Sequence, residues 1–140
     1  MRWADSASPT TGTSNPISLN QWYSAAVTYN GYVMSLYLNG VLQSSIAATN
    51  SLILNEPMTL GTDSGVQYFW NSQIADFQIY NTSLSTAEVQ GLYAEGMGGA
   101  PTRLQNLVGW WPLNGNANDY SGNGNNGAAT SVLYTSAWTK

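Results

Sequence analysis

The stretch "WYSAAVTYNGYVMSLYLNGVLQSSIA", which runs from Trp22 to Ala47, decides the fold. Apolar residues recur along it at every second position, as in strands that bury one face. Two Asn-Gly pairs, Asn30-Gly31 and Asn39-Gly40, interrupt this alternation. Because both residue types tolerate a positive φ, an Asn-Gly pair between apolar runs is the strongest short signal for a hairpin turn. The stretch therefore predicts consecutive antiparallel strands joined by tight turns.

Three further strands are expected later in the chain. The run "QIADFQIY" (73–80) alternates again, with Ala75, Phe77 and Ile79 on one face and polar residues on the other. The run "LVGWWPL" (107–113) is the next candidate, and a short last strand is expected around "SVLYTSAW" (131–138).

One helix is predicted between these strands. Ser85 is followed three residues later by Glu88, which forms the pattern of a capping box, and Gly96 is a suitable stop. Many short strands separated by turn signals, with one helix, are typical of an all-β sandwich. We predict an antiparallel jelly-roll β-sandwich with one short helix at about residues 85–94.

Composition excludes several classes of function. Charged residues make up 7% of the 140 residues, whereas an ordinary globular protein has about a quarter, and the net charge is −4. Binding to nucleic acid or to anionic lipid requires clustered Lys and Arg, which this chain lacks. No apolar run approaches the length that inserts into a membrane. Ser, Thr, Asn and Gly supply the polar surface instead, which favours an extracellular or cell-surface location.

The order of these motifs resembles the concanavalin A-like lectin/glucanase superfamily in its laminin G-like jelly-roll form. The closing half of that family has a Trp, a "vavtyd" strand, an "lYvNG" turn and an "IDdvriYn" strand followed by a helix. Residues 22–93 match in order through Trp22, "AAVTYNG", "MSLYLNG" and "IADFQIYNTSLSTAEVQGLY". The opening half typically begins "lvgyWpLdgnanDsSGngndG", and residues 107–138 begin "LVGWWPLNGNANDYSGNGNNG".

The two halves stand in reversed order in this chain. The resemblance implies that residues 1–95 form the closing half of a sandwich, 96–106 a Gly/Pro hinge, and 107–140 the opening strands. The chain could straddle two tandem repeats of a longer surface protein. Alternatively, the last segment folds back onto its own sandwich, or it completes the sandwich of a neighbouring subunit.

We favour the arrangement in which the last segment completes a neighbouring subunit. A sandwich that lacks its opening strand exposes a sheet edge, to which a strand of another chain can add. Donation that points onward and does not close gives a filament or array. The partner would then be another copy of the chain itself. The residues expected to carry this assembly are Leu107, Val108, Trp110, Trp111 and Leu113.

We expect no catalytic activity. Without His or Cys, the Ser-His-Asp and Cys-His arrangements cannot be built. Glycoside hydrolysis needs two carboxyl groups that flank one bond, and the glucanases of the resembled superfamily carry a Glu-x-Asp-x-x-Glu strand. No acidic residues of this chain occur at that spacing; the seven are Asp5, Glu56, Asp63, Asp76, Glu88, Glu95 and Asp119.

Calcium is the one candidate cofactor. Asp119, Ser121 and Asn123 alternate as oxygen-bearing residues before Gly124, as in a calcium loop, but the twelfth position is Thr130 and not Glu. Relatives in the family often bind calcium, and their "IDD" pair corresponds here to Ala75-Asp76, so the resemblance adds Asp76 to the candidate ligands. The alternative is a Gly/Asn turn whose Asp accepts backbone N–H bonds.

Glycans are a second candidate partner. Sugar rings stack on exposed aromatic side chains, and Tyr68, Trp70 and Trp110 are candidates for this contact. Neighbouring strand residues point to opposite faces, so at most one of Trp110 and Trp111 faces the core. The alternative is that these aromatic residues pack within the protein. Asn81 begins the sequence Asn-Thr-Ser, a potential N-glycosylation site in an exposed turn.

The sequence therefore predicts a non-catalytic extracellular β-sandwich subunit with a structural or adhesive role. We expect it to self-assemble head-to-tail by strand donation. The alternative function is a carbohydrate-binding, lectin-like module of a larger cell-surface protein.

Overall fold

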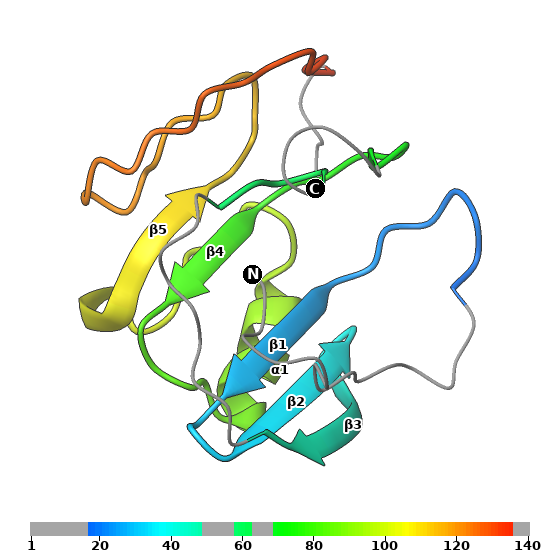
Figure 1. Ribbon diagram of the computed structural model, residues 1–140, viewed down its shortest axis with the longest axis vertical. Coiled ribbons are helices and arrows are strands. Elements are labelled where there is room, and N and C mark those ends of the chain that lie inside the picture. The colour runs from blue at the N-terminus through cyan, green and yellow to red at the C-terminus, as the bar shows by residue number, and fades with distance from the viewer. Residues whose placement is uncertain (1–16, 49–57, 63–68, 136–140) are drawn as a thin grey trace.

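A computed structural model of the chain describes residues 17–48, 58–62 and 69–135 (Figure 1). These residues contain five strands, one α-helix and one short 3-10 helix. All strand pairs are antiparallel, and the described residues include one α-helix, so the predicted all-β class is confirmed. The strands form a three-stranded sheet in the order β1-β2-β3 and a two-stranded sheet in the order β4-β5.

The three-stranded sheet is the predicted meander. Strands β1 (Ala25–Tyr29), β2 (Val33–Leu38) and β3 (Val41–Ala47) follow one another, and each is paired with the next. In the first turn, the side-chain oxygen of Asn30 accepts bonds from two backbone N–H groups. In the second turn, Asn39 and Gly40 both have a positive φ. Both predicted Asn-Gly turns are confirmed.

The two-stranded sheet joins segments that lie far apart in the sequence. Strand β4 (Phe77–Tyr80) pairs with β5 (Leu107–Trp111) of the same chain, and the two lie side by side in Figure 1. β4 is shorter than predicted, because Asp76 has a φ of +53° and interrupts the extended backbone. The predicted last strand is wrong for residues 131–135, which form no strand; residues 136–138 lie outside the described residues.

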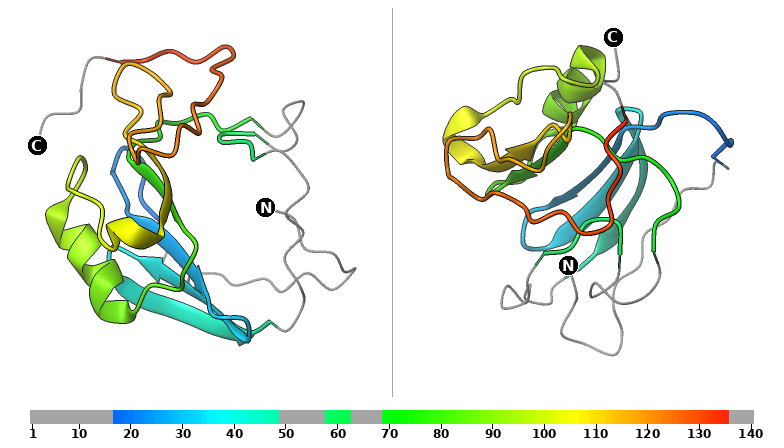
Figure 2. Two further views of the ribbon diagram at one scale, coloured as in Figure 1. Left: turned by 90° about the vertical axis from the view of Figure 1, so that its left-hand side faces the viewer. Right: turned by 90° about the horizontal axis from the view of Figure 1, so that it is seen from above.

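The α-helix begins and ends as its capping signals predict. Helix α1 (Thr86–Glu95) has Ser85 as its N-cap and Gly96 as its C-cap, and both bonds of the Ser85–Glu88 capping box are present. The helix lies against one face of the β1-β2-β3 sheet (Figure 2). A buried cluster lies at this contact, formed by Tyr37 of β2, Leu84 and Val89.

The other face of the three-stranded sheet is apolar and partly exposed. Ala26 and Tyr37 face the helix, so their strand neighbours Val27 and Leu38 face the opposite side. Val27 and Val41 are 59% and 60% exposed on that side. Among the described residues, no side chain is less than 2% exposed. Within the described part of the chain, no helix has the length and apolar character needed to span a bilayer.

The capping box gives a direct test of the helix. Replacing Ser85 with Ala removes the side-chain oxygen that accepts the N–H of Glu88, and it should lower the free energy of unfolding by about 1 kcal/mol. Urea denaturation followed by circular dichroism measures the effect. Ser83→Ala, a neighbouring serine with no cap bond, is the matched control. An equal loss in both variants would contradict the assigned cap.

Candidate functional site

The residues predicted for assembly gather on β5 and directly after it. Leu107 and Trp111 are buried, each 7% exposed, on the face of β5 that also carries Gly109. The Trp111 ring lies 5.8 Å from that of Phe77 on β4. It also lies across Gly109, where an added Cβ would come within 2.1 Å of the indole. Close packing against β4 therefore depends on a glycine that the sequence reading did not single out.

The remaining predicted assembly residues take different positions. Val108 and Trp110 lie on the opposite face of β5 and are half-buried, which confirms that one tryptophan of the pair faces the core. Leu113 lies beyond the end of β5 and has a φ of +60°, so it does not extend the strand.

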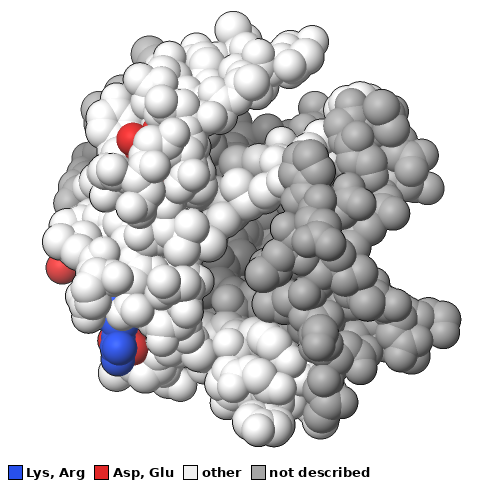
Figure 3. Space-filling model, turned by 60° about the vertical axis from the view of Figure 1, so that its left-hand side comes forward, with Lys and Arg blue, Asp and Glu red and all other residues white. Residues whose placement is uncertain are grey.

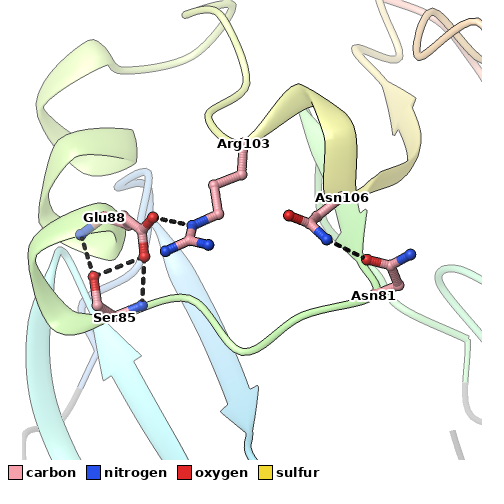
Figure 4. Close-up of polar contacts among 5 residues, drawn as sticks. All are labelled: Asn81, Ser85, Glu88, Arg103 and Asn106. Carbon is pink, nitrogen blue, oxygen red and sulfur yellow. Dashed lines mark hydrogen bonds and ion pairs between the residues drawn. The ribbon is translucent and has the colours of Figure 1, made fainter.

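Polar contacts hold both ends of β4 against β5. At the first end, an Asp76 carboxylate oxygen accepts the indole N–H of Trp110 at 2.7 Å, and the Asp76 backbone N–H donates to Pro112. At the other end, the Asn106 side chain donates to the side-chain oxygen of Asn81 at 2.9 Å (Figure 4). A slip of one residue in the pairing would break both contacts, so they fix the register.

Asp119 is held by three backbone N–H groups. One carboxylate oxygen accepts the N–H groups of Trp110 and Ser121 at 3.0 and 2.8 Å, and the other accepts that of Asn125 at 2.9 Å. Burial by itself raises the pKa of Asp119. The bonds to its carboxylate lower the pKa by more than burial raises it, so the pKa is about 2. The predicted turn, in which an Asp accepts backbone N–H bonds, is therefore present.

Three other side chains of this loop bond to the backbone of β5: the Ser121 hydroxyl, which donates to the Val108 oxygen at 3.4 Å, and those of Asn123 and Asn125. Asn123 donates to the carbonyl oxygens of Leu107 and Val108 at 2.8 and 3.1 Å. Asn125, which the sequence reading missed, donates to the Val108 oxygen at 2.8 Å. The density of Asn in "NGNANDYSGNGNNG" was the available signal, because Asn side chains readily bond to nearby backbone groups.

The structure divides the candidate calcium ligands into two groups. Asp119, Ser121 and Asn123 share one loop, in which Asp119 accepts the backbone N–H of Trp110. Asp76 lies outside this loop and accepts the indole N–H of Trp110. Among the described residues, no three Asp, Glu, His or Cys side chains cluster as a metal site would require. A calcium ion would have to replace the N–H donors that now occupy the Asp119 oxygens. Calcium binding stays a prediction.

The segment between α1 and β5 is anchored at several points. The Gly98 N–H donates to Asp76, and Gly99 and Pro101 are buried. Arg103, at a φ of +44°, forms an ion pair with Glu88 at the start of α1 (Figure 4). The bond from Arg103 lowers the pKa of Glu88, together with bonds from Ser85, to about 2. The predicted hinge is thus a packed connection in this arrangement.

The candidate sugar-binding aromatic residues are not equivalent. Trp70 is 60% exposed and lines an open hollow of about 380 Å³ with Leu60, Thr62 and Ile74. The Trp110 ring is half-buried, and its edge packs near Tyr120 at 6.3 Å between ring centres. Tyr68 lies outside the described residues. Trp70 is therefore the candidate whose ring is open to a ligand.

The potential glycosylation site lies where the sequence places it. Asn81 follows β4 directly and is exposed. Its side-chain oxygen accepts the bond from Asn106, which leaves the nitrogen, the atom that a glycan would modify, outside this contact. Glycosylation stays a prediction.

The bonds to Asp119 predict a dependence of stability on pH. The pKa of Asp119 is about 2 in the folded chain and about 4 in an unfolded one, so its contribution is present above pH 4 and lost as the pH falls to about 2. Asp119→Asn should lower the free energy of unfolding at pH 7 by about 1 kcal/mol and flatten the fall between pH 4 and 2. Urea denaturation across this range measures both effects.

The control for this experiment removes a carboxylate elsewhere. Glu95→Gln eliminates one negative charge at the exposed end of α1 and leaves the loop unchanged. If both variants follow the same pH profile, the bonds assigned to Asp119 do not stabilise the fold.

Comparison with known proteins identifies the family. A family model described as "Concanavalin A-like lectin/glucanases superfamily" matches residues 1–90. No curated protein matches the chain. Among solved structures, the chain is similar to residues 221–444 of an S-layer domain-containing protein from Clostridium thermocellum, with 26% identity and a TM-score of 0.49. That similarity covers 58% of this chain and 43% of the other, so this chain spans less than half of that structure.

The family match confirms the resemblance predicted for the first part of the chain. It ends before β5, so the reversed order of the two halves stays a prediction. Because residues 1–90 are well over half of the 140 residues, the chain belongs to the concanavalin A-like lectin/glucanase superfamily.

Proposed function

We propose that the chain is a non-catalytic extracellular structural module whose β5 segment can pass to the β4 strand of a second copy. The observation that carries this proposal is the pairing of β4 with β5 across the connection at residues 96–106. The strand pairing itself contains no residue of that connection. The same register can therefore form within one chain or between two, which is the condition for exchange of an element between subunits.

The connection supports exchange because it holds a strained residue and because one of its anchors is a partly exposed ion pair. A non-glycine residue in the left-handed region costs on the order of 1 kcal/mol, and Arg103 would lose this strain if the connection extended. Opening would break the Arg103–Glu88 ion pair, whose side chains are 42% and 21% exposed, and exposed ion pairs stabilise little. Because the β4–β5 contacts would be the same in both forms, the closed and exchanged forms differ mainly at this connection, and protein concentration would decide between them.

Composition and surface support a non-catalytic extracellular role. On the face shown in Figure 3, charged side chains are few and scattered among uncharged residues. Ser, Thr, Asn and Gly keep such a surface soluble in water with few charges. Such residues supply neither the paired carboxylates of a glycosidase nor the basic patch of a nucleic-acid-binding protein. Reciprocal exchange would give closed dimers, and onward donation would give a filament.

Shortening the connection tests the proposal. Deleting residues 98–100 removes up to about 10 Å of reach, so β5 pairs less readily with its own β4 and more readily with another. We expect the full chain with this deletion to form dimers or a ladder of larger species in light scattering. Inserting three residues at the same place is the matched control and should favour monomers. A deletion variant that stays monomeric at all concentrations would refute exchange.

A second candidate function is carbohydrate binding, favoured by the exposed ring of Trp70 beside its hollow. A sugar ring stacked on this indole would lose most of its binding when the ring is removed. Trp70→Ala should therefore weaken glycan binding at least tenfold in glycan-array and calorimetric measurements. Tyr32→Ala removes an aromatic ring that is even more exposed than that of Trp70, from the β1–β2 turn, and should leave binding unchanged. Equal binding by both variants would exclude Trp70 as the site.

A further inference from the structure

The two edges of β5 are occupied in different ways. In an antiparallel pair, successive residues alternate between facing the partner strand and facing away from it. The backbone groups of Trp110 bond to the loop that follows β5, so they face away from β4. By the same alternation, the backbone groups of Gly109 and Trp111 face β4, opposite Ile79 and Phe77.

The loop at residues 114–127 closes the edge that faces away from β4. The Trp110 N–H donates to Asp119 at 3.0 Å, and the Trp110 carbonyl accepts the Tyr120 N–H at 2.7 Å. The Val108 carbonyl accepts the side-chain amides of Asn125 and Asn123 at 2.8 and 3.1 Å. The loop thus takes the place that a neighbouring strand would have, and it folds back beside β5 in Figure 1.

A closed edge has a physical consequence for assembly. The unpaired N–H and C=O groups of an exposed strand template the addition of further strands, and proteins suppress this by covering or charging the edge. Here, asparagine side chains bind the Val108 carbonyl, the Tyr120 N–H binds the Trp110 carbonyl, and the Asp119 carboxylate binds the Trp110 N–H. An incoming strand would have to displace all of these bonds before it could pair with β5.

We infer that β5 and the loop at residues 114–127 form a donor segment with a single edge free to pair. This edge pairs with the β4 strand of one acceptor chain and with no second strand. This inference rests on the proposed exchange for the identity of the partner, a second copy of the chain. Asp76 supplies the specificity, because it binds the indole N–H of Trp110 in the matching register. Each donor then joins one acceptor, and assembly stops short of open-ended sheet growth.

Opening the closed edge in the full chain tests this inference. The double variant N123A/N125A removes three of the side-chain bonds to the Leu107 and Val108 carbonyls. We expect a rise in the fraction of protein in large thioflavin-positive species, from almost none to most of the sample. Asn118→Ala, in the same loop but with no side-chain bond to β5, is the matched control and should stay unchanged.

Hydrogen exchange separates this effect from unfolding. In the double variant, the amides of Gly109 and Trp111 should stay protected, because the β4 edge is intact. If the double variant loses this protection, Asn125→Ala alone, which removes only the 2.8 Å bond, replaces it in the experiment. If the edge variants are folded and form no more large thioflavin-positive species than Asn118→Ala does, the inference is overturned.

The outcomes also separate this inference from the proposed function. If the deletion of residues 98–100 yields oligomers but the edge variants do not grow further, exchange is supported and the single edge is refuted. If the deletion variant stays monomeric while the edge variants grow, exchange is refuted. In that case, the closed edge prevents further strands from adding to a β5 strand that pairs only within its own chain.

Discussion

The pairing of β4 with β5 is the interaction on which the rest of the site depends. β4 is a strand of four residues, and an isolated strand of this length cannot satisfy its backbone or bury its face. Its pairing brings Trp111 over Phe77 and places the Trp110 indole on Asp76. The loop at residues 114–127 binds the far edge of the same β5 strand. The packing of both tryptophans and the position of the loop therefore depend on the same pairing of β4 with β5.

The local features of the fold could be predicted from the sequence, and the long-range pairing could not. The Asn-Gly turns and the Ser85–Glu88 capping box act over two to four residues, so their signals stand in the sequence itself. The left-handed backbone at Asp76, which shortens β4, has no such signal, because it is fixed by contacts with Pro112, Trp110 and Gly98. Alternation placed one tryptophan in the core, but it could not identify β4 as the partner strand.

The candidate site shows why residue types alone leave two chemistries open. Alternating oxygen atoms at Asp119, Ser121 and Asn123 can converge on a cation or turn towards backbone groups, and the same spacing serves both. Here the three N–H groups around Asp119 supply the positive partners that a cation would otherwise provide. That choice depends on the position of β5, which the spacing does not encode. The density of Asn in this loop indicates bonds to the backbone, but which Asn bonds to the Val108 carbonyl depends on the position of β5.

Exchange between copies and protection of the free edge address one physical problem. A strand that leaves its own chain must keep an edge open for its acceptor, and an open edge invites further strands. The loop resolves this conflict because it travels with β5: Asp119 and Asn125 stay bound to that strand wherever it pairs. In the proposed exchange, the connection at residues 96–106 would govern where β5 pairs, and the loop would govern how many partners it has. Because the connection and the loop are different segments, each can be changed without altering the other, and under the proposed exchange the extent of assembly would follow from edge closure and not from the strength of pairing.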